Sequence, residues 1–292
     1  MAGRRDSNYL IMKPGRFLYL LISCLLLTAV AATAGTLVQF RTSLGNMVVE
    51  LYDRDKPVTV ANFIRYVEAG RYTNNFFHRC APGFVVQGGG FGVTDPASTN
   101  SLSSIIGVPT YDPITNEFGV GPYYSNVYGT IAMAKTAGGP DSATSQWFFN
   151  LANNSANLDN QNGGFTVFGR VIKGSNVLEQ FKIRSLCYGL VNLSGTLSEL
   201  PVVYAGCVWP QYRYLIYVDV ELLEADLHGP AEGLCSLHWN SVAGMTNIVE
   251  YADALVPEIW HPLLSTNATG GMLCATDPTL GITSRLYRVR VE

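Results

Sequence analysis

Short stretches in which apolar and polar residues alternate recur through most of the chain. The first, TLVQFRTSLGNMVVELY (36–52), holds two such runs on either side of SLGN, which predicts a β-hairpin. Later runs bounded by glycine or polar residues also predict strands: FFHRC (76–80), GFVVQGG (83–89), GTIAMAK (129–135), QWFFNLA (146–152), FTVFGRVI (165–172) and YLIYVDVELLEA (214–225). Because alternation places every second side chain on one face of a sheet, we expect a mainly β protein.

Two stretches have helical spacing instead. In residues 56–72, Pro57 suits a first helical turn and Gly70 suits a stop. The apolar positions between them are Val60, Phe63, Ile64 and Val67. The second stretch is GSNVLEQFK (174–182). Many short strands with only two helices indicate a closed barrel capped by helices, with the run 214–225 as the closing strand.

Other parts of the chain give weaker patterns. Residues 92–121 are loop-like and are expected to carry an insertion, and residues 183–212 have no clear period. Composition shifts after residue 225, and the remaining segment predicts strands separated by turns. We interpret residues 226–292 as a small C-terminal β module, with an extension of the barrel as the alternative.

The first 34 residues have the pattern of a secretion signal. A basic lead (Arg4, Arg5, Lys13 and Arg16) precedes the apolar stretch FLYLLISCLLLTAV, and small residues end the segment at Ala34. The apolar run is short for a membrane span, which argues against a retained anchor. Lipid attachment at Cys24 is a further alternative, opposed by the apolar residues that continue beyond it. We expect a cleaved signal peptide, no stable membrane span after cleavage, and a periplasmic or secreted product.

Charge and cysteines narrow the function class. The first 34 residues hold four of the 19 basic and one of the 22 acidic residues, so the mature chain carries a net charge of −6. With no basic stripe, nucleic acid is not an expected partner. The four cysteines Cys187, Cys207, Cys235 and Cys274 allow three disulfide pairings, and Cys80 is left as a buried free thiol. Without a C-x-x-C pair or closely spaced histidines, we expect neither a metal nor a cofactor.

An arginine and a glutamine stand in the apolar stretch FHRCAPGFVVQGG (77–89). Arg79 and Gln87 are an even number of residues apart, so they share one face if both flanking runs are strands. This stretch resembles the hallmark F-H-R-x-x-x-G-F-x-x-Q-G-G of the cyclophilins, which are peptidyl-prolyl cis–trans isomerases. The segment 129–154 and the later Leu158, Asp159 and VFGRV (167–171) extend the resemblance, which looks most like bacterial, exported members.

The resemblance implies a fold and a site. The fold is an antiparallel closed barrel of eight strands with two capping helices, here an isomerase domain over residues 35–225. Arg79 matches the catalytic arginine, and Gln87 matches a glutamine that hydrogen-bonds the substrate backbone. The positions that match substrate-binding residues are Phe84, Val85, Ala134, Lys135, Gln146, Phe148, Leu158 and Phe165.

Three positions depart from the family pattern. Asn157 replaces an indole, Phe165 takes the place of a pocket histidine, and Lys135 replaces a common asparagine. The first two argue against tight cyclosporin binding. We expect a monomeric isomerase that acts on proline-containing peptides and unfolded exported proteins. The alternative is a catalytically weak peptide-binding or adhesion protein that reuses the barrel.

Overall fold

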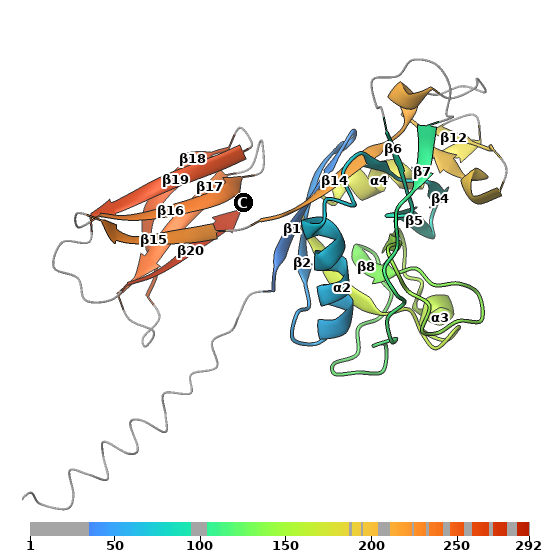
Figure 1. Ribbon diagram of the computed structural model, residues 1–292, viewed down its shortest axis with the longest axis horizontal. Helices are drawn as coiled ribbons and strands as arrows, with labels where there is room; N and C mark the ends of the chain where they lie inside the picture. Colours follow the sequence, from blue (N-terminus) through green and yellow to red (C-terminus); the bar gives the residue numbers. More distant parts are fainter. Residues whose placement is uncertain are drawn as a thin grey trace, which may run out of the picture. The chain divides into compact units, whose positions relative to one another are not determined.

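The computed structural model describes eleven ranges of the chain (Figure 1). They are residues 35–94, 104–186, 189–193, 195–203, 211–223, 225–231, 234–241, 246–253, 259–268, 271–278 and 285–291. The predicted signal peptide lies outside them, and so do Cys187 and Cys207.

Cys80 is a buried free thiol, as expected. Cys274 is an exposed free thiol, which contradicts its expected place in a disulfide. It lies across the sheet from His238, whereas Cys235 lies across from Asp277.

Antiparallel pairing joins eleven strands into one sheet, in the order β4-β5-β9-β8-β10-β2-β1-β14-β3-β6-β7. Its strands are β1 (Leu37–Thr42), β2 (Gly45–Leu51), β3 (Asn75–Phe76), β4 (Arg79–Ala81), β5 (Val85–Gly88), β6 (Phe91–Val93), β7 (Ile105–Gly107), β8 (Thr130–Met133), β9 (Trp147–Asn150), β10 (Val167–Lys173) and β14 (Tyr217–Leu222). The mainly β class is confirmed.

The closed barrel of eight strands is not confirmed. Within the described residues the sheet order has two ends, β4 and β7, and β14 lies inside that order between β1 and β3 rather than closing it. One of the two ends, β4, is a strand of three residues whose outer edge is already taken. The Cys80 N–H donates to the Glu199 carbonyl at 2.8 Å, so a segment from outside this sheet takes the free edge of β4.

The hairpin expected over residues 36–52 is confirmed. Strands β1 and β2 pair from Leu37↔Glu50 to Thr42↔Gly45. Gly45 has a φ of +124° at the turn, which a residue with a side chain rarely adopts.

The run FFHRC is two strands rather than one. The Phe77 N–H donates to the Ile216 carbonyl at 3.0 Å, whereas the His78 N–H donates to the Gln87 carbonyl at 3.1 Å. The chain therefore changes partner between these residues, from the side of β14 to β5, and this change divides β3 from β4.

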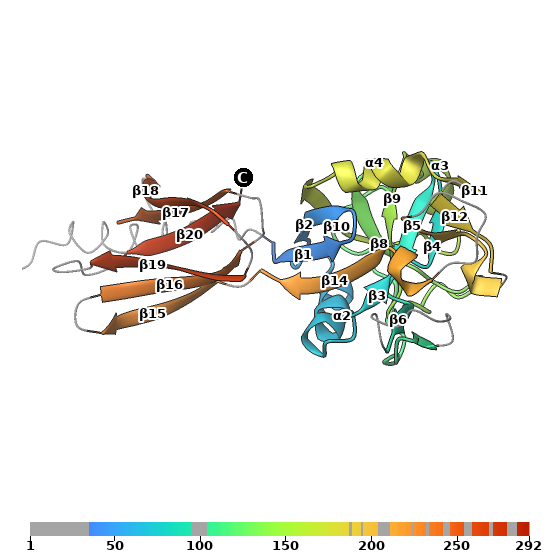
Figure 2. The same cartoon turned by 90° about the horizontal axis from the view of Figure 1, so that it is seen from above.

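Both expected helices are present. Helix α2 (Pro57–Glu68) begins at the predicted proline, and α4 (Asn176–Lys182) follows β10. They lie at opposite ends of the curved sheet (Figure 2). A short helix that the sequence pattern did not indicate, α3 (Ser155–Leu158), lies between β9 and β10. The described residues include no helix that is both long and apolar enough to cross a membrane.

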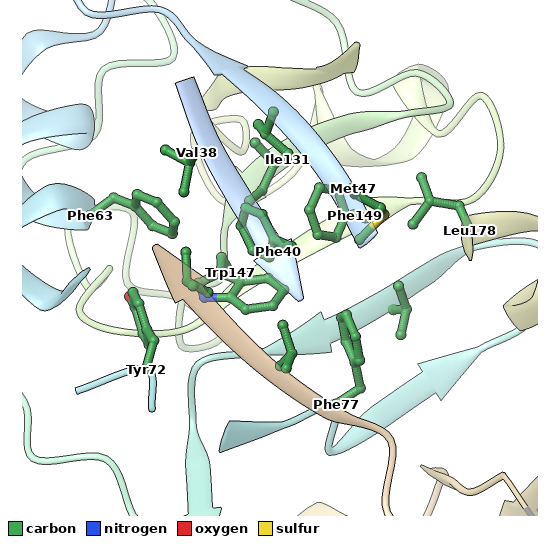
Figure 3. Packing of buried hydrophobic residues seen from close by; sticks show 14 of the residues in the cluster. Val38, Phe40, Met47, Phe63, Tyr72, Phe77, Ile131, Trp147, Phe149 and Leu178 are labelled. Atoms are coloured by element: carbon green, nitrogen blue, oxygen red, sulfur yellow. The ribbon is translucent and has the colours of Figure 1, made fainter. Parts of the chain in front are cut away.

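The main core is a cluster of buried apolar side chains from the large sheet and the helices α2 and α4 (Figure 3). Phe40 meets the Trp147 and Phe149 rings edge to face, each at 5.1 Å between centroids. Phe63 of α2 and Leu178 of α4 belong to the same buried cluster. Aromatic packing of this kind holds the strands that carry the candidate site.

Three smaller sheets complete the described fold. The first is β11 (Ser185–Leu186), β12 (Gly189–Val191) and β13 (Leu200–Pro201), with the short 3-10 helices η2 (Gly195–Leu197) and η3 (Tyr212–Tyr214) nearby in sequence. The other two are β15-β16-β19 and β18-β17-β20. Their strands are β15 (Ala225–Ala231), β16 (Leu234–Ser241), β17 (Thr246–Ala252), β18 (His261–Asn267), β19 (Gly271–Pro278) and β20 (Leu286–Val291).

The C-terminal strands pair only with one another among the described residues. They enclose a small core of Leu237, Trp239, Val249 and Ala275. Buried Trp239 donates to Asn247 Oδ1 at 3.1 Å. The separate module stays a prediction, and its expected boundary at residue 226 falls one residue inside β15.

Candidate active site

Strand register aligns a row of side chains across five neighbouring strands. Arg79 of β4 pairs with Gln87 of β5, and Gln87 pairs with Phe148 of β9. Phe148 pairs with Ala132 of β8, which pairs with Val167 of β10. Directly paired residues in an antiparallel sheet point to the same face. The prediction that Arg79 and Gln87 share a face is therefore confirmed.

This row lies on the face opposite the main core. Trp147 and Phe149, the neighbours of Phe148 in β9, both belong to the interior cluster (Figure 3). Phe148 belongs to a second cluster, and Val85 and Val86 divide between the two clusters in the same way. Continuous apolar runs in β5 and β9 thus supply the core on one face and the candidate site on the other.

The second cluster gathers every apolar residue that was predicted to bind substrate. Its predicted members are Phe84, Val85, Ala134, Phe148, Leu158 and Phe165. The Phe148 and Phe165 rings meet edge to face at 5.8 Å between centroids. The Phe165 N–H donates to the Leu158 carbonyl at 3.0 Å, so the loop after α3 brings both side chains to this cluster.

Buried amides hold α3 and its loop against the strands. Asn154 Nδ2 donates to the Phe84 carbonyl at 2.8 Å, and Asn126 Nδ2 donates to the Phe165 carbonyl at 2.9 Å. Asp159 accepts from the Asn126 backbone N–H at 3.0 Å. Burial alone would raise the pKa of Asp159, but hydrogen bonds from Asn126 and Tyr123 outweigh it and lower that pKa. Because most partners are amides, this scaffold keeps its charge state across the neutral pH range.

The two predicted glutamines of the site are hydrogen-bonded to each other. Gln87 Nε2 donates to Gln146 Oε1 at 2.7 Å, which places both predicted glutamines together. His78 lies beside them and is 3% exposed. Burial, together with the nearby Arg79 cation, lowers the pKa of His78 to about 4, so this ring is neutral at pH 7. A neutral, buried histidine suits a structural role.

Lys135 stands at the rim of the apolar cluster. Its Nζ donates to the carbonyls of Asn162 at 2.7 Å and Gly164 at 2.6 Å, and lies 4.7 Å from the Phe165 ring centroid. Burial lowers the pKa of Lys135 to about 8, against the opposing effect of Asp141. Phe165, which was predicted to replace a pocket histidine, therefore contacts both the Lys135 cation and the Phe148 ring. Asn157 is exposed on α3 and lies outside the cluster.

Arg79 has a partner that the sequence pattern did not reveal. Its Nε lies 2.8 Å from Glu199 Oε2, and the two side chains are 37% and 42% exposed. Glu199 comes from the part of the chain that showed no clear period, so no local signal marked it. The Arg79 side chain therefore lies at the β4 end of the row of paired residues, and its ion-pair partner comes from outside the motif.

Comparison with known proteins gives one consistent result. The model of the family described as cyclophilin type peptidyl-prolyl cis-trans isomerase/CLD matches residues 37–191. A peptidyl-prolyl cis-trans isomerase of Acinetobacter baylyi is 41% identical over 167 residues, covering 56% of this chain and 82% of the relative. Isomerase A of Dickeya dadantii is 42% identical over 171 residues, with 56% and 83% covered. Isomerase B of Escherichia coli is 37% identical over 150 residues, with 50% and 84% covered.

Proposed function

Because the chain belongs to the cyclophilin family and is a peptidyl-prolyl cis–trans isomerase, we propose that it accelerates rotation of X–Pro bonds in exported proteins, with Arg79 as its catalytic residue. The observation that carries this proposal is the row of directly paired residues that runs from Arg79 of β4 to Val167 of β10. It places Arg79 directly across from Gln87, and Gln87 directly across from the apolar Phe148, on one face of the sheet. A cation at the end of an apolar row is what the rotation of a prolyl amide requires.

The reaction needs no bond to be made or broken. The trans form of an X–Pro bond is favoured by only about 0.5–1 kcal/mol, whereas amide resonance raises a barrier of about 18–20 kcal/mol. At the top of this barrier the prolyl nitrogen is pyramidal and carries a lone pair. A guanidinium that donates to this nitrogen stabilises the twisted state more than the planar one, and this difference lowers the barrier.

The remaining predicted residues hold the peptide while it rotates. The proline ring packs against the cluster of Phe84, Phe148 and Leu158. Gln87 donates to the substrate backbone, and the backbone at Ala134 and Lys135 pairs with it as an edge strand does. Uncatalysed rotation takes tens of seconds, so a turnover of about 10³ per second requires the site to lower the barrier by roughly 6–7 kcal/mol.

The assignment to exported substrates rests on the N-terminal segment. Basic residues followed by an apolar stretch and Ala34 match a cleaved signal peptide. An isomerase in that compartment meets chains that are still unfolded and have non-native prolyl isomers. Similar isomerases do occur in bacteria, whereas export itself rests on the N-terminal segment alone.

A proline-peptide isomerisation assay on Arg79→Ala tests the catalytic assignment. We expect kcat/KM to fall by about 100-fold or more, as when a charged donor to the transition state is removed. Arg41→Ala is the matched control, because Arg41 also pairs with a glutamate and is 42% exposed against 37% for Arg79. Equal activity of wild type and Arg79→Ala, with both folded by circular dichroism, would refute the assignment and favour a non-catalytic peptide-binding protein.

The mass of the mature N-terminus tests export. Cleavage after Ala34 leaves a chain that starts at Gly35. A chain that retains Met1, or that starts at Cys24 with an added lipid, would contradict cleavage after Ala34.

A further inference from the structure

Glu199 contacts the edge of the candidate site through both its backbone and its side chain. Its carbonyl accepts the N–H of Cys80 at 2.8 Å, and its carboxylate lies 2.8 Å from Nε of Arg79. The two contacts reach adjacent residues of β4. The carboxylate is therefore anchored to the same piece of backbone that carries the guanidinium.

The segment that presents Glu199 is itself fixed. Leu200 of β13 pairs with Val191 of β12, and both Leu200 and Val202 belong to a buried cluster with Phe76 and Tyr212. The backbone of Glu199 is therefore fixed by its hydrogen bond to Cys80 of β4 and by the burial of the next residue, Leu200. Its position does not depend on the ion pair alone.

The ion pair is too exposed to matter much for folding. With side chains 37% and 42% exposed, Arg79 and Glu199 are largely solvated, and such pairs contribute little to stability. Their contact has a geometric consequence instead. An arginine on its own has many rotamers, whereas a carboxylate on Nε restricts the guanidinium to a narrower set.

The atom used in the pair leaves the rest of the guanidinium available. A guanidinium has five N–H donors in a planar fork, and the Nε–H is the inner one. The ion pair places Oε2 of Glu199 2.8 Å from this inner nitrogen. The donors on the two terminal nitrogens remain for a prolyl nitrogen and the neighbouring carbonyl.

We propose that Glu199 is a positioning residue for Arg79, which holds the guanidinium ready for the twisted amide before substrate binds. The inference rests on the proposed catalytic role of Arg79. A donor that is already oriented needs less reorganisation in the transition state, so Glu199 acts on kcat rather than on KM.

The test compares Glu199→Ala and Glu199→Gln with a control of equal exposure. The control is Glu221→Ala, because Glu221 is also 42% exposed and pairs with an arginine, Arg41, at 2.6 Å. We expect Glu199→Ala to lower kcat by about five- to tenfold, with KM within about twofold. Glu199→Gln keeps an acceptor oxygen and should fall between Glu199→Ala and wild type. Glu221→Ala should match wild type.

Two further readouts separate positioning from a structural effect. In ¹⁵N-arginine-labelled protein, the Nε–H signal of Arg79 should be slow to exchange in wild type and fast in Glu199→Ala. In the Arg79→Ala background, removing Glu199 should change kcat by less than about 1.5-fold, because the effect runs through Arg79. Thermal midpoints should be nearly the same throughout.

Several results would overturn the proposal. They are an unchanged kcat in Glu199→Ala, a raised kcat, which would show that Glu199 restrains Arg79, or an equal loss in the Arg79→Ala background. If Arg79→Ala itself matches wild type, the failure lies with the catalytic assignment of Arg79. The Nε–H exchange would still report whether Glu199 orients the side chain.

Discussion

Gly88 of β5 is in close contact with the Trp147 indole. A Cβ built at Gly88 would lie 2.5 Å from Cη2 of Trp147 and 2.8 Å from Cζ2. Gly88 is therefore required because the large indole of Trp147, its partner on β9, leaves no room for a Cβ. Gly89 faces the same indole, because a Cβ there would lie 2.6 Å from Nε1 of Trp147, and it also has a φ of +74°.

Gly88→Ala should lower the free energy of unfolding by about 1–3 kcal/mol through overpacking. Combined with Trp147→Phe, which removes the outer ring, the loss should be smaller than the sum of the single losses. Urea unfolding of the four proteins measures this coupling. Gly107→Ala is the control, since nothing lies within 4 Å of a Cβ there. Strict additivity would show that the indole is not the obstacle.

We expect Lys135 to make substrate preference depend on pH. Because its pKa is lowered by burial to about 8, the side chain is a cation below that pH and neutral above it. The advantage of a peptide with glutamate beside proline over the glutamine peptide should be about two- to threefold at pH 7 and low salt. It should disappear as pH rises toward 9. Measured kcat/KM for both peptides, with Lys135→Arg as a permanently charged control, checks this. A constant advantage in wild type would contradict it.

Helix α2 is capped by a distant carboxylate. Its own N-cap residue, Lys56, makes no side-chain cap, but Glu117 accepts the N–H groups of Val58 at 3.1 Å and Thr59 at 2.7 Å. Lys56 Nζ in turn donates to the Glu117 carbonyl at 2.9 Å. The loop residue and the helix start therefore stabilise each other, with the negative charge at the positive end of the helix dipole.

Glu117→Ala should lower the free energy of unfolding by about 1–2 kcal/mol and speed amide exchange at Thr59. The matched control is Glu68→Ala at the other end of α2, where a negative charge is unfavourable and its removal should be neutral or slightly stabilising. Equal effects of the two substitutions on the urea midpoint would argue against the cap.

The isomerase sheet and the C-terminal sheets form separate hydrogen-bond ladders among the described residues. Each also has its own buried cluster, around Phe40 in one and Trp239 in the other. This separation predicts that residues 35–225 fold and work without residues 226–292. The truncated chain should keep kcat/KM within about twofold of the longer one, since every proposed site residue precedes the cut. An insoluble or inactive fragment would show that the module completes the fold.

Local patterns were enough for much of this molecule. The hairpin at Gly45, the start of α2 at Pro57 and the shared face of Arg79 and Gln87 follow from periods of two or 3.6 residues and from turn chemistry, which act over a few positions. The apolar residues of the site were found through a motif resemblance, and their gathering in one cluster agrees with it.

Other features depended on which distant segments meet. The division of FFHRC, the contact of Glu199 with Arg79 and the cap by Glu117 all join parts of the chain that are far apart in sequence. A local sequence pattern does not predict such long-range contacts, because they form only when the strands pair and the loops pack in the assembled fold. The sequence by itself determined the local elements and the order of residues on each face. The tertiary structure alone decided that Glu199 lies beside Arg79. The short strand β4 leaves one edge open for hydrogen bonding, and only the assembled fold brings the backbone of Glu199 to that edge.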